Sequence, residues 1–299
     1  MSSSGKMNKR VIITAALAGA GTTREQHPNV PYTPAEFAEE AALCHAAGAA
    51  MVHVHARTDD GVATHNIDRI RATHDAIKDK TPQLIVNLTS AVGWNKTPEE
   101  RLRQIVEIKP EMASLNTNSM NFSVIDKKTG EIRFDYIFDN TFTMLQDFGR
   151  SMEENGIKPE IEVYDMSGID NVRLIMKQGF FTGPMNFNFV WGVAGGQSMR
   201  PGSFATMVGA LPAGSNFSAC GVGSEEFPAV MQSCLMGGHM RVGLEDNLRT
   251  PKGVLAKGSW ELVEWAVRIA ECLGREPASP DQAREIMGIR CRGALRAIC

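Results

Sequence analysis

The sequence predicts an α/β fold, a (β/α)8 or TIM barrel, as a single domain over residues 1–299. Short apolar runs bounded by Gly, Asn, Asp or Ser alternate with stretches of helical spacing, which is typical of a parallel sheet covered by helices. The sequence holds eight such runs, enough to close a barrel where five or six would leave an open sheet. A barrel of this kind takes about 250 residues, so the length of the chain also fits one domain.

The predicted strands follow one another along the whole chain. They are the runs at residues 11–17, 51–57, 84–89, 111–117, 159–165, 185–192, 215–221 and 239–246. Between them, several helices begin with a proline, which favours the first helical turn. We expect such helices at residues 33–48, 97–108 and 200–211.

Two segments depart from simple alternation. Residues 118–158 form the longest interval between strands, and they contain a polar hairpin-like insert, DKKTGE, before the next helix. The segment SPDQAREIMGI, from Ser279, predicts one extra C-terminal helix, which could pack on a neighbouring subunit. Residues 1–10 are expected to form a disordered or tag-like N-terminus.

A doubly wound open sheet is the competing architecture. Such a sheet would place the glycine pattern G-x-G-x-x-G directly after the first strand, where a helix would then begin. Residues 17–28 instead read LAGAGTTREQHP, which lacks that spacing. The first loop therefore favours the barrel.

The composition indicates an ordinary globular protein. A formal net charge of -3 offers no basic patch for nucleic acid, and no run of about 18 apolar residues predicts a membrane span. The six cysteines are scattered without a C-x-x-C pair, and the N-terminus lacks the pattern of a signal peptide. We therefore expect a cytoplasmic protein without nucleic-acid or membrane partners.

The clearest candidate for chemistry is the pair His53 and His55. Residues two apart on a strand point to the same side, and the C-terminal ends of barrel strands line the mouth. Two imidazoles on one side suit a metal ion. The alternative is that one histidine is a hydrogen-bonded core residue and the other belongs to the loop.

A second cluster ends the last predicted strand, where Arg241, Glu245 and Asp246 follow one another closely. Charged side chains buried at a strand end are costly unless they are paired or bind a ligand. If Glu245 joins the two histidines, the set of two His and one Glu with an open position is typical of catalytic zinc. The alternative is an Arg241–Asp246 ion pair that braces the barrel end.

Other polar residues follow the predicted strands and together describe a polar mouth of substrate size. They are Thr14, Asn87, Thr89, Ser90, Ser114, Asn116, Glu162, Tyr164, Asn186 and Asn188. The glycine-containing turn at residues 192–198 also gives backbone N–H groups room to approach an anion, so a phosphate or pantetheine contact is a hypothesis there.

Several segments together resemble the β-keto acid cleavage enzymes, whose founding activity is 3-keto-5-aminohexanoate cleavage. The resemblance runs from about Val11 to about Ile289 in the same order and with compatible spacing. It is carried by the segments TAALAGAGTTREQHPNVPYTPAEFAEEA, GAAMVHVHARTDDG, KPEMASLNTNSMNF, EIEVYD and GGHMRVGLEDNL.

The resemblance implies a TIM barrel with zinc on two histidines and a glutamate, which correspond here to His53, His55 and Glu245. It gives Arg241 and Asp246 the role of an acid/base dyad. It also implies substrate contacts at Gly21, Thr89, Ser90, Ser114 and Asn116. The family member that acts on an amino-bearing keto acid has an acidic residue where this chain has Gly21, so a cationic substrate would lose that carboxylate partner unless Glu25 or another acid replaces it.

The reaction implied by the resemblance converts a β-keto acid and acetyl-CoA into acetoacetate and a new acyl-CoA. We expect zinc, or another divalent metal, to stabilise the enolate, and acetyl-CoA to act as co-substrate. Because a guanidinium stays protonated, Asp246 is the better base, oriented by Arg241. The family also suggests amino acid or carnitine catabolism and a homo-oligomer, a dimer or tetramer.

Two other functions compete with this interpretation. A zinc-dependent hydrolase or aldolase could use the same barrel, although a hydrolase with H-x-H would add histidines on strands five and six, where this sequence has none. A non-catalytic ligand-binding barrel would have no need for the cluster of His, Glu, Arg and Asp side chains at one mouth. A reaction that depends on CoA would argue against the hydrolase or aldolase. Failure to bind metal would favour the non-catalytic barrel.

Overall fold

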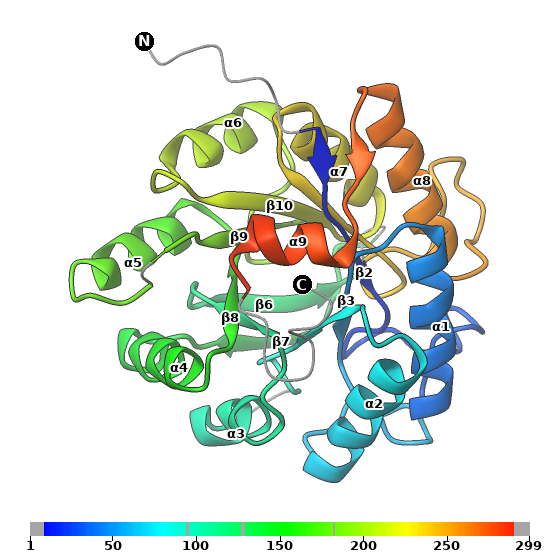
Figure 1. Cartoon of the computed structure of the whole chain (residues 1–299), viewed down its shortest axis with the longest axis horizontal. Coiled ribbons are helices and arrows are strands. Elements are labelled where there is room, and N and C mark those ends of the chain that lie inside the picture. The colour runs from blue at the N-terminus through cyan, green and yellow to red at the C-terminus, as the bar shows by residue number, and fades with distance from the viewer. Residues whose placement is uncertain (1–8, 94–95, 127–128, 182, 290–299) are drawn as a thin grey trace.

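The computed structural model describes residues 9–93, 96–126, 129–181 and 183–289. Its centre is a closed barrel of eight parallel strands, surrounded by helices (Figure 1). The strand order around the barrel is β10-β11-β2-β3-β4-β5-β8-β9. The predicted TIM barrel is therefore confirmed, and the open sheet is excluded.

Each of the eight predicted runs overlaps one barrel strand. The barrel strands are β2 (Ile13–Ala16), β3 (Met51–Val54), β4 (Ile85–Leu88), β5 (Met112–Asn116), β8 (Lys158–Val163), β9 (Asn186–Trp191), β10 (Asn216–Gly221) and β11 (His239–Val242). The barrel closes where β2 pairs with β11, with Met240 opposite Ile13.

Helices cover the outside of the barrel (Figure 1). They are α1 (Pro34–Ala47), α2 (Ile67–Lys80), α3 (Pro98–Ile108), α4 (Phe142–Glu154), α5 (Met166–Met176), α6 (Pro201–Ala210), α7 (Glu226–Leu235) and α8 (Ser259–Cys272), with a short 3-10 turn, η1 (Gly223–Glu225). The predicted proline starts of α1, α3 and α6 are confirmed. Thr33 and Thr97 form capping boxes, which satisfy backbone N–H groups that a helix start leaves free.

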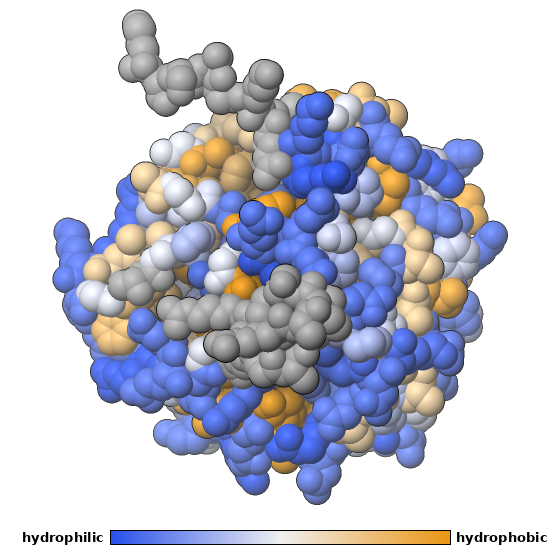
Figure 2. Space-filling model, viewed as in Figure 1, coloured by the Kyte–Doolittle hydropathy of each residue, from blue (hydrophilic) through white to orange (hydrophobic). Residues whose placement is uncertain are grey.

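The extra C-terminal helix is confirmed as α9 (Pro280–Met287), but it packs on its own barrel. Ala283 and Met287 are buried against Ile12, Met51 and Ile85, near the N-terminal ends of the strands. In Figure 1, α9 lies across that end of the barrel, and Figure 2 shows mainly hydrophilic residues on the same face. The apolar side of this helix closes its own barrel. The expectation that this side packs on a neighbouring subunit is therefore wrong.

The segment before the barrel is partly ordered. Strand β1 (Arg10–Val11) pairs in parallel with β12 (Glu276–Pro277). Arg10, which was expected to belong to a disordered or tag-like N-terminus, therefore lies in a strand, and residues 1–8 of that segment lie outside the described residues. Cys291 and Cys299, two of the six cysteines in the sequence, also lie outside the described residues. In the described part of the chain, no helix has the length and apolar character needed to span a membrane.

The insert between β5 and α4 is an antiparallel hairpin of β6 (Met120–Ile125) and β7 (Ile132–Phe138). The predicted hairpin is confirmed, while Lys127 and Lys128 of its DKKTGE segment lie outside the described residues. The hairpin is tied to the loop after β9, because Ser123 N donates to Ala194 O at 3.3 Å. Its Asn121 carbonyl lies where a side chain at Gly195 would be, so only glycine permits this approach.

Candidate metal and substrate site

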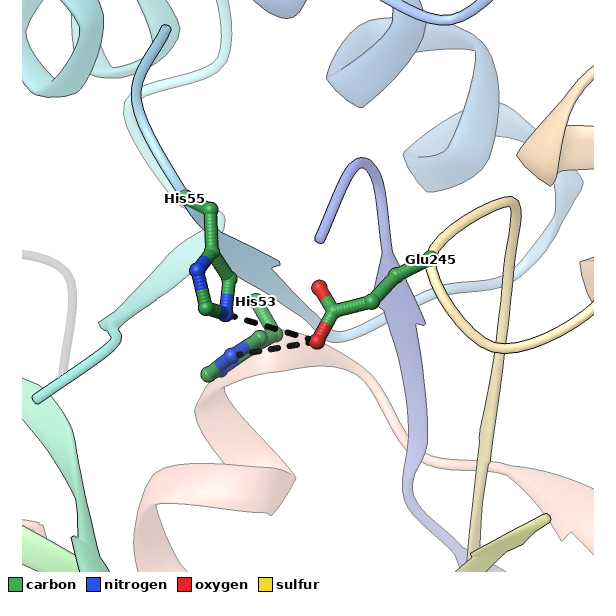
Figure 3. A group of neighbouring side chains, drawn as sticks. All are labelled: His53, His55 and Glu245. Carbon is green, nitrogen blue, oxygen red and sulfur yellow. Dashed lines mark ion pairs between the residues drawn. The ribbon is translucent and has the colours of Figure 1, made fainter. Parts of the chain in front are cut away.

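His53, His55 and Glu245 come together at the C-terminal mouth of the barrel (Figure 3). His53 lies in β3, His55 follows that strand directly, and Glu245 follows β11. The Nε2 atoms of His53 and His55 lie 3.7 and 3.4 Å from Glu245 Oε1. One potential ligand atom from each residue lies within 4.8 Å of the others, so the three side chains can share one ion.

The surroundings of these three residues fit a metal ion. The His53 side chain is 1% exposed, and burial lowers its pKa well below the ordinary value, so the imidazole is neutral as a ligand must be. Burial alone would raise the pKa of Glu245, but Arg241 and the histidines lower it, so the carboxylate is charged. Glu245 Oε2 is buried and has no hydrogen-bond partner among the described residues. Such an acceptor is costly unless a ligand occupies it.

Local backbone geometry holds Glu245 in place. After β11 the chain turns at Gly243, whose φ of +145° and close contact with the backbone of Ala16 admit only glycine. Glu245 N then donates to Ala16 O at 3.1 Å. On the other side, Gly19 packs against the Glu245 side chain so closely that a Cβ at Gly19 would lie 2.6 Å from Glu245 Cγ. The buried Arg57 guanidinium donates to Gly19 O and fixes that loop.

Arg241 is the centre of a buried charge network. Its Nη2 lies 2.6 Å from Glu245 Oε1, and its Nε lies 2.9 Å from Asp246 Oδ2. Its Nη1 donates to Glu162 Oε1 at 3.0 Å. The ion pair between Arg241 and Asp246 is therefore present, but it is part of the same network as the metal cluster and not an alternative to it.

Asp246 differs electrostatically from its neighbour Glu245. Burial raises the pKa of Asp246 to about 6, and the Arg241 cation only partly offsets this. The position of Glu162 on a predicted strand places it at the mouth but gives it no role in the network. The sequence could not reveal its contact with Arg241, because the two residues are separated by 79 positions.

A cavity of about 730 Å³ opens above these side chains. Its lining includes the metal cluster, Arg241, Asp246, Glu162 and Tyr164, together with the predicted substrate contacts Gly21 and Thr89. This volume is in the range of small-molecule sites. On its outer side the cavity is lined by residues of the β6–β7 hairpin and of the loop after β9.

Three other predicted substrate contacts, Ser90, Ser114 and Asn116, lie behind the cavity lining. All three are at most 1% exposed. Ser90 N donates to Ser114 Oγ at 3.0 Å, and Asn116 Oδ1 accepts from the Tyr164 hydroxyl at 3.0 Å. The structure thus places them in support of the lining, and direct contact with a substrate stays a prediction.

Four further residues of the predicted polar mouth are not part of the cavity lining. Asn87 Nδ2 donates to Glu160 Oε2 at 2.6 Å, and Asn188 Nδ2 donates to Cys220 Sγ at 3.6 Å. Thr14 and Asn186 line a small cavity lower in the barrel, together with Glu160. Asn186 Nδ2 donates to Met287 O of α9 at 3.0 Å. The position of Thr14 and Asn186 in predicted strands does not distinguish the two ends of the barrel. Both residues precede the strand ends, so they face the end that α9 closes.

An anion contact at the glycine-containing turn of residues 192–198 stays a prediction. The N–H groups of Gly192, Gly196 and Gln197 already donate to carbonyl oxygens. Beside the turn, the Glu225 carboxylate accepts the N–H of Met199 at 2.7 Å. An anionic group bound on this side of the turn would therefore lie close to the Glu225 carboxylate.

Comparison with known proteins agrees with this architecture. Residues 10–289 match the family described as beta-keto acid cleavage enzyme. The chain is 43% identical over 281 residues to the 3-keto-5-aminohexanoate cleavage enzyme of Acetoanaerobium sticklandii, covering 94% of this chain and 99% of that protein. It is 32% identical to the 3-dehydrocarnitine:acetyl-CoA trimethylamine transferase of Rhizobium meliloti, covering 93% and 96%.

The solved structures give the same fold. The apo structure of ObcA superposes with a TM-score of 0.72 at 23% sequence identity. The match covers 88% of this chain and 66% of that one, so the chain spans about two thirds of ObcA. At this identity the likeness concerns the barrel alone.

Proposed function

The chain belongs to the β-keto acid cleavage enzyme family, and from that premise we propose that it converts a β-keto acid and acetyl-CoA into acetoacetate and a new acyl-CoA. The proposal is carried by one observation, the convergence of the cluster His53–His55–Glu245 and the pair Arg241–Asp246 in one cavity. Relatives named as acetyl-CoA-dependent transferases of 3-dehydrocarnitine and 3-oxoadipate support acetyl-CoA as the second substrate.

His53, His55 and Glu245 would hold the metal, for which we favour zinc. Two neutral imidazoles and one carboxylate form the ligand set of catalytic zinc, which leaves positions open for a substrate. A bound divalent ion would supply Lewis-acid stabilisation of negative charge on the keto oxygen. Arg241 Nη2 donates to Glu245 Oε1 at 2.6 Å and so fixes the orientation of that carboxylate.

We assign the proton transfer to Asp246. The C2 proton of a β-keto acid is acidic because C2 lies between two carbonyl groups. Arg241 cannot accept this proton, since a guanidinium remains charged in proteins. It donates instead to both oxygens of Asp246, at 2.9 and 3.2 Å, and so holds the base toward the cavity.

The remaining steps exchange the acyl groups. After Asp246 takes the C2 proton, the electron pair on C2 forms a bond to the acetyl carbonyl carbon, and CoA leaves as the thiolate. The thiolate adds to the original C3 carbonyl carbon, and the C2–C3 bond breaks. Asp246 then returns the proton to C2, which gives acetoacetate and an acyl-CoA that carries the original R group.

The direct test is acyl exchange. Purified, zinc-loaded protein is incubated with acetyl-CoA and a panel of neutral, anionic and cationic β-keto acids, and acetoacetate and new acyl-CoA are followed by mass spectrometry. We expect both products to form together from at least one acid, and none without acetyl-CoA. Cleavage that proceeds equally well without CoA would overturn the proposal in favour of an aldolase or hydrolase, and bound zinc without any turnover would also contradict it.

A further inference from the structure

We propose that the R group of the β-keto acid is uncharged and apolar and that it packs against the inner side of the β6–β7 hairpin. This inference rests on the proposed function, because it concerns the part of the substrate that this reaction transfers to CoA. Three features support it: aromatic side chains of the hairpin that line the cavity, contacts that hold the hairpin in place, and the charged residues of the cavity lining.

Three aromatic residues of the hairpin, Phe122, Tyr136 and Phe138, line the cavity, and we call them the aromatic wall. The ring of Phe122 lies 5.7 Å from Tyr136 and 6.0 Å from Phe138. Rings that contact one another at these distances form a continuous apolar surface. Between two wall residues, Ile137 points the other way and is 63% exposed.

The aromatic wall leads to the reactive end of the cavity. Phe138 meets Tyr164 edge to face, with 6.4 Å between the ring centroids. Tyr164 follows β8, two residues after Glu162, which contacts Arg241. A substrate whose carboxylate and keto groups lie at the metal cluster therefore has the aromatic wall beside the remainder of the molecule.

The wall is held in place from behind. The Arg101 guanidinium lies 5.1 Å from the centroid of the Phe138 ring and donates to Asp139 O and Asn140 Oδ1. The tie between Ser123 and Ala194 fixes the other strand of the hairpin. Because Arg101 is 3% exposed and is not part of the cavity lining, its charge is not offered to a substrate.

The charges in the cavity disfavour an anionic R group. Among the described residues that line it are the carboxylates of Glu162, Glu225, Glu245 and Asp246, and Arg241 is the one guanidinium. Arg241 already contacts three of those carboxylates. An additional negative charge would therefore meet repulsion without a free partner.

A cationic R group would meet one lining carboxylate outside the Arg241 network, Glu225, among the described residues. At Gly21 an added Cβ would have no neighbour within 4 Å, so this position leaves open space in the lining and supplies no carboxylate. Glu25 is exposed and is not part of the lining. Glu225 Oε2 accepts the Met199 N–H at 2.7 Å, which holds this carboxylate at the turn beside Met199. An apolar group needs none of these partners and gains from contact with the aromatic wall.

The first test uses the wild-type enzyme and compares β-keto acids of similar length whose R groups are alkyl, carboxylate-bearing or ammonium-bearing. We expect kcat/KM to be highest for the alkyl acid and to increase about ten-fold with an added methylene until the pocket is full. A higher kcat/KM for either charged acid would overturn the inference while leaving the proposed function intact. Absence of exchange with every acid would refute the proposed function, and the inference would fall with it.

The second test asks which substrate contacts the aromatic wall. Phe122→Ala is compared with Ile137→Ala, which removes an exposed side chain from the opposite side of the same hairpin. We expect Phe122→Ala to raise KM for the alkyl keto acid at least ten-fold, with KM for acetyl-CoA unchanged, and Ile137→Ala to change neither. If Phe122→Ala raises only KM for acetyl-CoA, the wall holds the pantetheine arm and the inference is wrong.

Discussion

Gly19→Ala should weaken metal binding although residue 19 is not a ligand. The added Cβ would lie 2.6 Å from Glu245 Cγ, whereas carbon atoms in favourable contact are about 3.5–4.0 Å apart. Glu245 or its loop must therefore move by roughly 1 Å, and functional geometry of this kind tolerates about 0.5 Å. Neighbours that orient metal ligands typically change affinity by about 10–100-fold when altered, which corresponds to about 1.4–2.8 kcal/mol.

The assay is competition for zinc against a chromophoric chelator, with circular dichroism to confirm the fold. Gly21→Ala is the matched control, because it makes the same change two positions further along, where a Cβ meets no atom within 4 Å. Neither glycine has a positive φ, so alanine is compatible with both backbones. If Gly19→Ala binds zinc as tightly as Gly21→Ala and the wild type, the packing of Gly19 does not control the position of Glu245.

Three further outcomes follow from the site. Asp246→Asn should lower kcat by about 10²–10⁴-fold, measured by acyl exchange, with zinc still bound, and near-full turnover would exclude Asp246 as the base. His53→Ala should abolish the rise in Tm that zinc gives the wild type, and an unchanged rise would contradict the ligand assignment. Burial raises the pKa of Glu160 to about 7, from 4.5, so its stabilising contribution is complete below pH 4.5 and lost as pH rises through 7. In urea unfolding, the free energy of unfolding of Glu160→Gln should therefore exceed that of the wild type by on the order of 3 kcal/mol at pH 8 and equal it at pH 4. Equal stability of the two proteins at pH 8 would show that burying the charged form of Glu160 does not destabilise the fold.

The fold could be predicted because local patterns suffice for it. Alternation of apolar runs with proline-started helices locates every barrel strand, and the absence of the dinucleotide glycine pattern separates the barrel from an open sheet. The packing of α9 could not be predicted in the same way. An amphipathic helix shows that it has an apolar side, but not whether that side meets its own barrel or another chain.

The candidate site was predictable as far as strand geometry reaches. His53 and His55 are two apart, so their common direction follows from one strand. The contacts of Glu162 with Arg241 and of Gly19 with Glu245 depend on how distant strands align around the barrel. A one-residue change of register would remove both contacts, and no local pattern specifies that register.

Closure of the barrel has a consequence for synthesis of the protein. Ile12 and His239, which are joined by a hydrogen bond where the barrel closes, are 227 positions apart. A ribosome adds about 5–20 residues each second, so the first barrel strand emerges roughly 11–45 seconds before the strand that pairs with its free edge. Unpaired strand edges promote aggregation of nascent chains. We therefore expect the yield of folded protein in a host cell to depend on protection of the β2 edge during those seconds, as well as on the stability of the finished barrel.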